Sequence, residues 1–301
     1  MIVTFGSINC DFIFTMQEMP EPGQTLLAKN FRVEAGGKGA NQALAAARDG
    51  AEVVMVGAVG HDELAATAMQ NLVESGVDIR HVARLPVPTG CASIFIDAEG
   101  RNMIAVASGA NLAAKSMQVD DALLFAASIV LMQMENDPEE IAQLIRRAHQ
   151  AGKKSILNLA PACRLGAELL SLCSLIIVNE DEAVALAGWL NCTSTAETLS
   201  KASGTGIMRT LGGEGAEAYV EGEYIPIPAI KVDVVDTTAA GDCFIGVLAA
   251  GMDRGLSLND AMRRASVAAA LACSHRGSQA SIPFASDTNQ TPLARALSAV
   301  L

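Results

Sequence analysis

The prediction of the fold starts from one stretch, Lys231-Val-Asp-Val-Val-Asp-Thr-Thr-Ala-Ala-Gly-Asp-Cys-Phe-Ile-Gly246. Its β-branched run, residues 232–235, predicts a short strand, residues 237–241 predict a turn of small residues, and residues 244–250 predict an apolar helix. Unpaired backbone N–H groups meet where such a turn enters a helix, and the helix dipole favours negative charge there. The stretch therefore predicts a phosphate site, with an ordinary helix start as the open alternative.

Asp242 lies in the first turn of this predicted helix. A carboxylate is a poor ligand for phosphate because like charges repel. The same carboxylate is well suited to take a proton from a hydroxyl that attacks phosphorus. We therefore interpret Asp242 as a candidate general base.

The composition limits the class of protein. The chain has 301 residues, of which 50% are hydrophobic and 4% aromatic, and a formal net charge of −12. This charge argues against nucleic acid or an anionic membrane as the main partner. No apolar run reaches the roughly 18 to 20 residues of a membrane helix, and no signal-peptide pattern opens the chain. The seven scattered cysteines, without a C-x-x-C pair, favour reduced thiols in a cytoplasmic protein.

Short apolar runs alternate with helical patterns along much of the chain. Strands are expected at residues 2–5, 53–59, 129–132, 155–159, 175–178 and 207–210. Polar residues follow several of these runs, among them Glu135, Asn158 and Asn179. Because the carboxyl ends of parallel strands share one edge, this pattern predicts a site there. The expected fold is α/β, a doubly wound, mostly parallel sheet flanked by helices, in one domain over residues 1–301.

Two further segments carry candidate ligand contacts. Asn9 and Asp11 follow the first strand on the same side and suit vicinal hydroxyls, although Asx-turn chemistry explains them equally well. Glycines before the predicted helix 42–48 let the backbone approach a ligand, with Lys38 and Asn41 pointing toward it; a flexible turn is the alternative. The spacing is not a Walker A loop, and no dinucleotide fingerprint occurs.

Four short extended pieces fall outside the βα alternation, within about residues 12–35 and 89–108. We interpret them as one small antiparallel β lid that excludes water from a site. The exposed apolar face of such a sheet favours a homodimer formed through the lid. The Gly-rich turn 210–215 predicts either a nucleotide contact or a hairpin loop, and the sequence favours neither.

Six motifs in order resemble those of the ribokinase-like (PfkB) sugar kinases. They span residues 2 to about 283 and read Gly6-Ser-Ile-Asn-Cys-Asp11, Gly36-Gly-Lys-Gly-Ala-Asn-Gln42, Val178-Asn-Glu180, Thr210-Leu-Gly212, Asp236-Thr-Thr-Ala-Ala-Gly-Asp242 and Gly277-Ser-Gln-Ala-Ser-Ile-Pro283. Within the family, residues 36–41 and Leu131-Met-Gln-Met-Glu135 resemble the ribokinases more than the fructokinases or adenosine kinases. Two positions depart from the common pattern, since Ala239 stands where Gly is usual and His275 where Arg is usual.

The resemblance implies an activity, which is ATP-dependent phosphorylation of the primary hydroxyl of a furanose. D-ribose, giving the 5-phosphate, is the expected substrate. Deoxyribose, another sugar or a nucleoside is the nearest alternative, and the lid contains Phe12, Phe14 and Phe95, whose rings suit a nucleobase. A catalytically silent sugar-binding protein is the alternative of another class.

The resemblance also implies residue roles. Catalytic roles fall to Asp242, Gly241 and Ala240. Sugar contacts are expected from Asn9, Asp11, Gly37, Lys38, Gly39, Asn41, Glu135 and Asp242. Nucleotide contacts are expected from Asn179, Thr210, Leu211, Gly212, Gly213, Gly215, Gly241 and Ser266. Mg²⁺ is expected to bridge the phosphates, and a K⁺ site is expected at Asp236, Thr238, Ala272, His275, Gly277 and Ser281.

Overall fold

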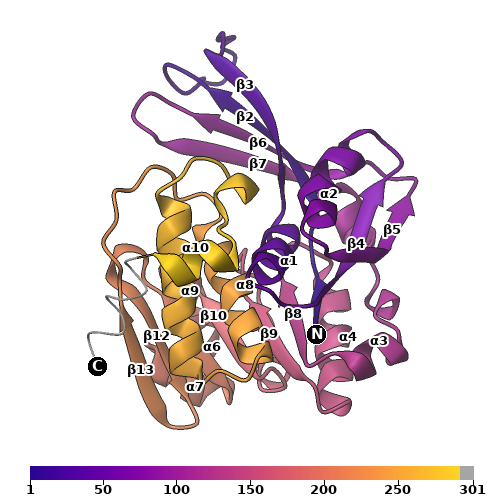
Figure 1. The fold of residues 1–301 in the computed structure, drawn as a ribbon, viewed down its shortest axis with the longest axis vertical. Coiled ribbons are helices and arrows are strands. Elements are labelled where there is room, and N and C mark those ends of the chain that lie inside the picture. Colours follow the sequence, from indigo (N-terminus) through magenta and orange to yellow (C-terminus); the bar gives the residue numbers. More distant parts are fainter. Residues whose placement is uncertain (292–301) are drawn as a thin grey trace.

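A nine-stranded sheet runs through the centre of the structure, a computed structural model that describes residues 1–291 (Figure 1). Its strand order is β13-β12-β11-β10-β9-β8-β1-β4-β5. The strands from β11 to β5 in this order are parallel, and the β12–β13 hairpin is antiparallel. The bounds are β1 Ile2–Phe5, β4 Val53–Gly60, β5 Asp78–Leu85, β8 Ile129–Gln133, β9 Lys154–Asn158, β10 Leu175–Val178, β11 Gly206–Thr210, β12 Gly215–Val220 and β13 Glu223–Pro228.

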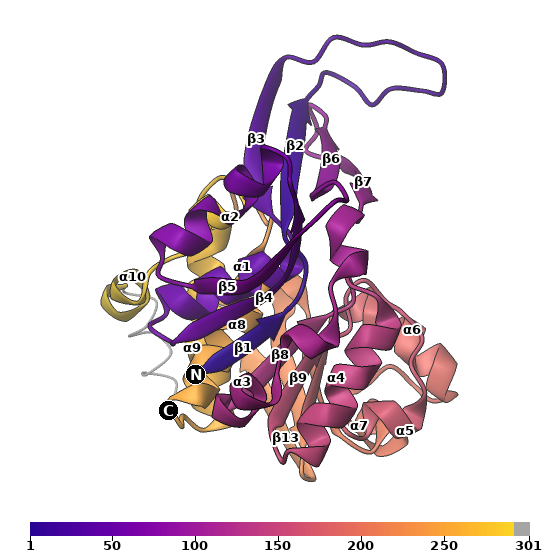
Figure 2. The ribbon, with the colours of Figure 1, turned by 90° about the vertical axis from the view of Figure 1, so that its right-hand side faces the viewer.

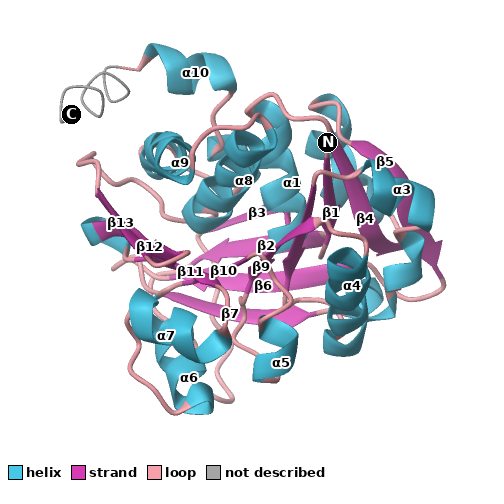
Figure 3. Ribbon diagram, turned by 90° about the horizontal axis from the view of Figure 1, so that it is seen from below, coloured by secondary structure: helices cyan, strands magenta, loops and turns pink. Residues whose placement is uncertain are grey.

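Helices cover both faces of this sheet, as the doubly wound pattern predicts (Figure 3). One face packs against α1 (Lys38–Arg48), α2 (Leu64–Glu74), α8 (Ala240–Asp253) and α9 (Leu258–Cys273). The other packs against α3 (Asp121–Ala126), α4 (Pro138–Gln150), α5 (Ala167–Leu170), α6 (Glu180–Leu190) and α7 (Ala196–Ser203). The last described helix is α10, Ala285–Gln290. No helix within residues 1–291 is both long and apolar enough to cross a membrane.

A second, four-stranded sheet projects from one end of the main sheet (Figure 2). Its order is β3 (Asn30–Gly36), β2 (Asn9–Thr15), β6 (Gly90–Ile96) and β7 (Asn102–Ala107). The sheet unites the two segments that the sequence assigns to the lid. Both outer pairs are antiparallel as expected, whereas the central β2–β6 pair is parallel.

The predicted strand at residues 232–235 is wrong. These residues form an irregular connection, in which the amides of Val235 and Asp236 both donate to the Cys273 carbonyl at the end of α9. Their β-branched side chains have no neighbouring strand to pair with, so propensity alone does not make a strand. The helix after the turn is confirmed as α8, and it begins at Ala240.

The order of strands in the main sheet changes direction at β1. Strand β1 lies between β4 and β8, so the chain builds the sheet outward from it in both directions. Ligand sites of open α/β sheets form at such a switch point. Helix α1 closes over this point because Gly39 packs directly on the backbone that follows β1.

Gly39→Ala should destabilise the fold, because a Cβ at this position would lie 2.5 Å from the Ser7 nitrogen and 2.6 Å from Gly6 backbone carbons. Relieving this contact requires a backbone shift that costs roughly 1 to 3 kcal/mol. Gly213→Ala is the control, since a Cβ there meets no atom within 4 Å. Denaturant unfolding measures both variants, and equal midpoints for Gly39→Ala and the wild type would contradict the packing argument.

Candidate active site

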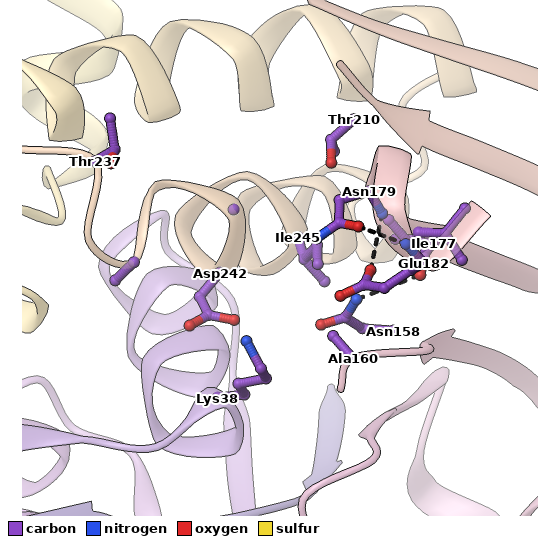
Figure 4. A pocket seen from close by; sticks show the side chains of 13 residues that line it. Lys38, Asn158, Ala160, Ile177, Asn179, Glu182, Thr210, Thr237, Asp242 and Ile245 are labelled. Carbon is purple, nitrogen blue, oxygen red and sulfur yellow. Dashed lines mark hydrogen bonds between the residues drawn. The ribbon is translucent and has the colours of Figure 1, made fainter. Parts of the chain in front are cut away.

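A pocket of about 230 Å³ opens at the carboxyl edge of the main sheet (Figure 4). It is bounded by the start of α8 on one side and by the ends of β9, β10 and β11 on the other. Its lining residues are Lys38, Asn158, Ala160, Ile177, Val178, Asn179, Glu182, Thr210, Thr237, Ala239, Gly241, Asp242 and Ile245.

The start of α8 presents backbone amides to this pocket. The preceding residue, Ala239, has a left-handed backbone (φ 59°), and no side chain caps the helix. The Ala240 amide donates back to the Thr237 carbonyl. A Cβ on Gly241 would meet no atom within 4 Å, so this backbone faces open space. An uncapped helix start with an open approach is a favourable place for a phosphate group.

The start of α1 differs, because its amides are already bonded within the protein. The Lys38 amide donates to Glu135 Oε2 at 3.1 Å, and the Gly39 amide donates to Ser7 Oγ at 3.2 Å. The Ala40 amide donates to the Ser7 carbonyl. Gly37 and Gly39 of this segment therefore permit close contact between protein backbones.

Asp242 lies at the junction between the pocket and α1. Its side chain is only 8% exposed. The Asn41 Nδ2 donates to Asp242 Oδ2 at 2.9 Å, and the Gln42 Nε2 donates to Asp242 Oδ1 at 2.9 Å. Each carboxylate oxygen thus accepts one amide hydrogen, which leaves lone pairs to accept a proton.

Lys38 brings a positive charge to the same place. Figure 4 shows its ammonium group directed toward the neighbouring Asp242 carboxylate. The nearby Asp242 carboxylate raises the pKa of Lys38, and this effect outweighs the opposing effect of burial. Lys38 therefore stays cationic at neutral pH, as a group that binds phosphate oxygens must.

Of the predicted sugar contacts, Lys38 and Asp242 line the pocket, and the others lie outside its lining. Asn9 and Asp11 lie on β2, and Glu135 follows β8, where its carboxylate accepts a hydrogen bond from Ser7 Oγ. Asn9 Oδ1 accepts from Asn111 Nδ2 at 2.7 Å. Ser7 and Asn111 are contacts that the sequence reasoning missed, because both partners lie about a hundred residues away.

Asp11 is the most electrostatically strained group of this region. Burial raises its pKa to about 7, and the neighbouring carboxylates of Glu135, Glu34 and Asp242 add to the effect. The side chain is therefore close to half protonated at neutral pH. A hydroxyl-bearing ligand that donates to Asp11 would favour its ionised form.

Asp11→Asn should stabilise the protein in a pH-dependent manner. Between pH 3.8 and about 7 the folded chain binds more protons than the unfolded chain, so the wild type loses stability as the pH rises. The variant avoids this loss, so its advantage should grow from near zero at pH 4 to on the order of 1 to 3 kcal/mol at pH 8. Thermal unfolding across this range measures it, with Asp233→Asn as the exposed control. An advantage that does not change with pH would contradict the burial argument.

The predicted nucleotide contacts divide into two groups. Asn179 and Thr210 line the pocket, as does Gly241. The others lie outside the lining: Leu211, Gly212, Gly213, Gly215 and Ser266. The Leu211 amide donates to the Gly215 carbonyl, so the Gly-rich turn closes the β11–β12 hairpin.

Glu182 is a pocket residue that the sequence reasoning did not assign. It forms a reciprocal cap with Asn179 at the start of α6, in which each backbone amide donates to the other side chain at 2.8 Å. Burial is the main factor that raises the pKa of Glu182. The spacing Asn179-Glu-Asp-Glu182 is that of a capping box. It does not indicate that the Glu182 side chain lines the pocket.

The expected K⁺ residues are brought together in part. Asp236 Oδ1 accepts the Thr238 amide at 2.9 Å, and Asp236 Oδ2 accepts the Gly277 amide at 3.1 Å. Burial alone would raise the pKa of Asp236, but these hydrogen bonds lower it. His275 is exposed, with Nδ1 at 2.9 Å from the Leu271 carbonyl, and Ser281 Oγ donates to the Ser278 carbonyl. Within residues 1–291 no cluster of three or more His, Cys, Asp or Glu side chains could hold a metal ion.

A buried carboxylate, a lysine and an uncapped helix start beside the carboxyl ends of parallel strands define a phosphotransferase-type site on an α/β fold. The family model of the pfkB family carbohydrate kinases matches residues 1–285. The chain belongs to this family, which confirms the resemblance read from the six motifs.

Individual relatives extend this result over the whole chain. The chain is 34% identical over 295 residues to the ribokinase of Haemophilus influenzae, covering 95% of this chain and 96% of the relative. It is 32% identical over 298 residues to the deoxyribokinase of Salmonella typhi, covering 96% and 97%. The structure of Arabidopsis thaliana ribokinase complexed with ribose and ATP superimposes with a TM-score of 0.87 at 31% identity, covering 96% of this chain and 97% of that one. The expected fold class is thereby confirmed.

Proposed function

We propose that this carbohydrate kinase transfers the γ-phosphoryl group of ATP to the primary hydroxyl of D-ribose and forms D-ribose 5-phosphate. The observation that carries the proposal is the position of Asp242, which faces the pocket and also lies in the electrostatic neighbourhood of Asp11. Asp242 would thus lie between the nucleotide and the hydroxyl groups of the sugar. The ribokinase relatives support ribose and ATP as the ligands.

The proposed reaction is an in-line displacement. Asp242 accepts the proton of the primary hydroxyl, and the hydroxyl oxygen forms a bond to the γ-phosphorus while the bond to ADP breaks. The start of α8 and the Lys38 ammonium face the charge on the transferring group. Asn9, Asp11, Gly37, Gly39, Asn41 and Glu135 would hold and surround the sugar.

The proposal includes two cations. Mg²⁺ would accompany the phosphates, and K⁺ would bind near the turn before α8. Mg²⁺ prefers one or two carboxylates together with phosphate oxygens. Glu182 fits this preference, because it lines the pocket opposite Lys38 while both oxygens of Asp242 already accept amide hydrogens. Mg²⁺ would neutralise charge on the phosphates. For K⁺, the Asp236 carboxylate, which the amides of Thr238 and Gly277 hold in place, would be the charged ligand.

The four-stranded sheet would act as the lid and as a dimer contact in a cytoplasmic homodimer. An apolar row crosses all four strands at Phe31, Phe14, Phe95 and Met103, which are register partners. The rings of Phe14 and Phe31 are 5.0 Å apart, and those of Phe14 and Phe95 are 5.3 Å apart. Phe31 and Met103 are each 50% exposed, so a second copy would bury apolar surface.

The same sheet weighs against a nucleoside substrate. Alternation along β2 puts Phe12 and Phe14 on the opposite face from Asp11. The Phe12 ring stacks on Phe31 instead, and the Phe14 ring packs against Phe31 at a tilt. A deoxyribose kinase remains the second candidate because the deoxyribokinase relative is nearly as similar as the ribokinase.

Asp242→Asn tests the assignment of the base. The variant keeps the shape of the side chain and loses the proton acceptor, so turnover should fall by about two to four powers of ten. Sugar and nucleotide binding, measured by calorimetry, should persist. Turnover near that of the wild type would remove Asp242 from this role.

Substrate choice is tested by a coupled ADP-release assay on a panel of pentoses, hexoses and nucleosides, with and without K⁺. The proposal expects the highest kcat/KM with D-ribose and an increase on addition of K⁺. A higher kcat/KM with deoxyribose would favour the second candidate. Absence of turnover with every compound would favour a sugar-binding protein without catalysis.

A further inference from the structure

A series of hydrogen-bonded, buried side-chain amides reaches Asp242 from outside the pocket lining. Gln133, at the end of β8, donates through Nε2 to Gln42 Oε1 at 2.7 Å. Gln42, on α1, donates through Nε2 to Asp242 Oδ1 at 2.9 Å and to Asn158 Oδ1 at 3.0 Å. Gln42 and Gln133 are both fully buried. Neither residue lines the pocket.

We propose that Gln42 is a positioning residue for the catalytic base, held in its own orientation by Gln133. This inference rests on the proposed role of Asp242. It adds two residues that the family motifs and the pocket do not assign to the reaction. Gln42 touches neither ligand and acts only through the Asp242 carboxylate.

The direction of the hydrogen bonds supports this role. An amide group can be turned so that either its oxygen or its nitrogen faces a neighbour. Because Gln133 donates to the Gln42 oxygen, the Gln42 nitrogen must face Asp242 and Asn158. The amide that meets the carboxylate is therefore a donor in a fixed orientation, and water has no access to replace it.

The two bonds on Asp242 act at different oxygens. Asn41 holds Oδ2 and Gln42 holds Oδ1, so together they fix the rotation of the carboxylate about its Cβ–Cγ bond. A base must present a lone pair to the attacking hydroxyl within a narrow range of angles. Loss of either contact should broaden that range without removing the base.

Gln42 is the better residue to test. Asn41 is also an expected sugar contact, and its Oδ1 accepts from Gln279 Nε2 at 3.0 Å, so a change there would mix several effects. Packing alone does not require an amide at Gln42. An apolar side chain of similar length would fill the space between α1 and α8 equally well.

The experiment compares Gln42→Met and Gln133→Met with the wild type in steady-state assays with D-ribose and ATP. Gln42→Met should lower kcat about 10- to 100-fold and leave both KM values within about threefold. Gln133→Met should lower kcat by a smaller factor, about 3- to 10-fold, because Gln42 remains but is free to turn. The double variant should match Gln42→Met, since Gln133 acts through Gln42.

Gln118→Met is the matched control. Its amide also donates two hydrogen bonds within the fold, to the carbonyls of Gly57 and His81, but it is not in contact with Asp242. Thermal unfolding of all variants separates lost stability from lost turnover. The control should keep kcat even if its melting temperature falls as far as that of Gln42→Met.

Three results would overturn the inference. A kcat of Gln42→Met equal to that of the wild type excludes positioning by Gln42. Full additivity of the two substitutions excludes the action of Gln133 through Gln42. If Gln42→Met does not fold, a Gln133→Met variant with the kcat of the wild type overturns the inference instead. A further fall of kcat when Gln42→Met is added to Asp242→Asn excludes action through the base. A wild type that phosphorylates no sugar overturns the proposed function itself, whereas an active wild type with an unaffected Gln42→Met overturns this inference alone.

Discussion

The close contact between α1 and α8 is the constraint on which the site depends. Gly246 makes this contact possible, because a Cβ there would lie 2.3 Å from the Gln42 carbonyl and 2.6 Å from the Ala45 side chain. Only with the two helices this close can Asn41 and Gln42 on α1 reach Asp242 on α8. At the far end of α1, buried Asp49 pairs with Arg254 and Arg264, which fixes the same two helices and α9 together.

This arrangement concentrates negative charge in a small volume. Burial, together with the nearby carboxylates of Glu135 and Asp242, raises the pKa of Asp11, and Lys38 places a cation close to these carboxylates. Such a cluster is unfavourable for folding, and it is favourable for binding a ligand that donates several hydroxyl hydrogens. The uncapped start of α8 supplies the opposite polarity on the other side of Asp242. In the proposed function, Asp242 thus separates a hydroxyl-binding side of the site from a phosphate-binding side.

The sequence predicted what is local and periodic. The α/β alternation, the helix after residue 239 and the place of Asp242 in its first turn all follow from spacing and turn chemistry. The strand predicted at residues 232–235 was wrong, because β-propensity does not produce a strand where no partner strand lies beside it. The parallel β2–β6 pair was out of reach because β3, α1, β4, α2 and β5 lie between the two strands in sequence.

Polar contacts between residues far apart in the chain are the other feature that the sequence did not predict. Ser7 and Gln42 lie inside motifs that assign them no role, Asn111 lies outside the motifs, and the partners of all three lie 91 or more residues away. Asn41 was expected to bind sugar, and the structure adds a hydrogen bond to the base. The Gly-rich turn 210–215 had two readings, of which the hairpin is observed, while only Thr210 reaches the pocket.

The most direct test of the account is a structure of this protein with D-ribose and a non-hydrolysable ATP analogue. The account predicts that the primary hydroxyl lies within hydrogen-bond reach of Asp242, about 2.6 to 3.2 Å, with the γ-phosphate against the Gly241 amide. Both ligands bound with the hydroxyl well beyond one water molecule from Asp242, or with the phosphates away from the start of α8, would contradict it.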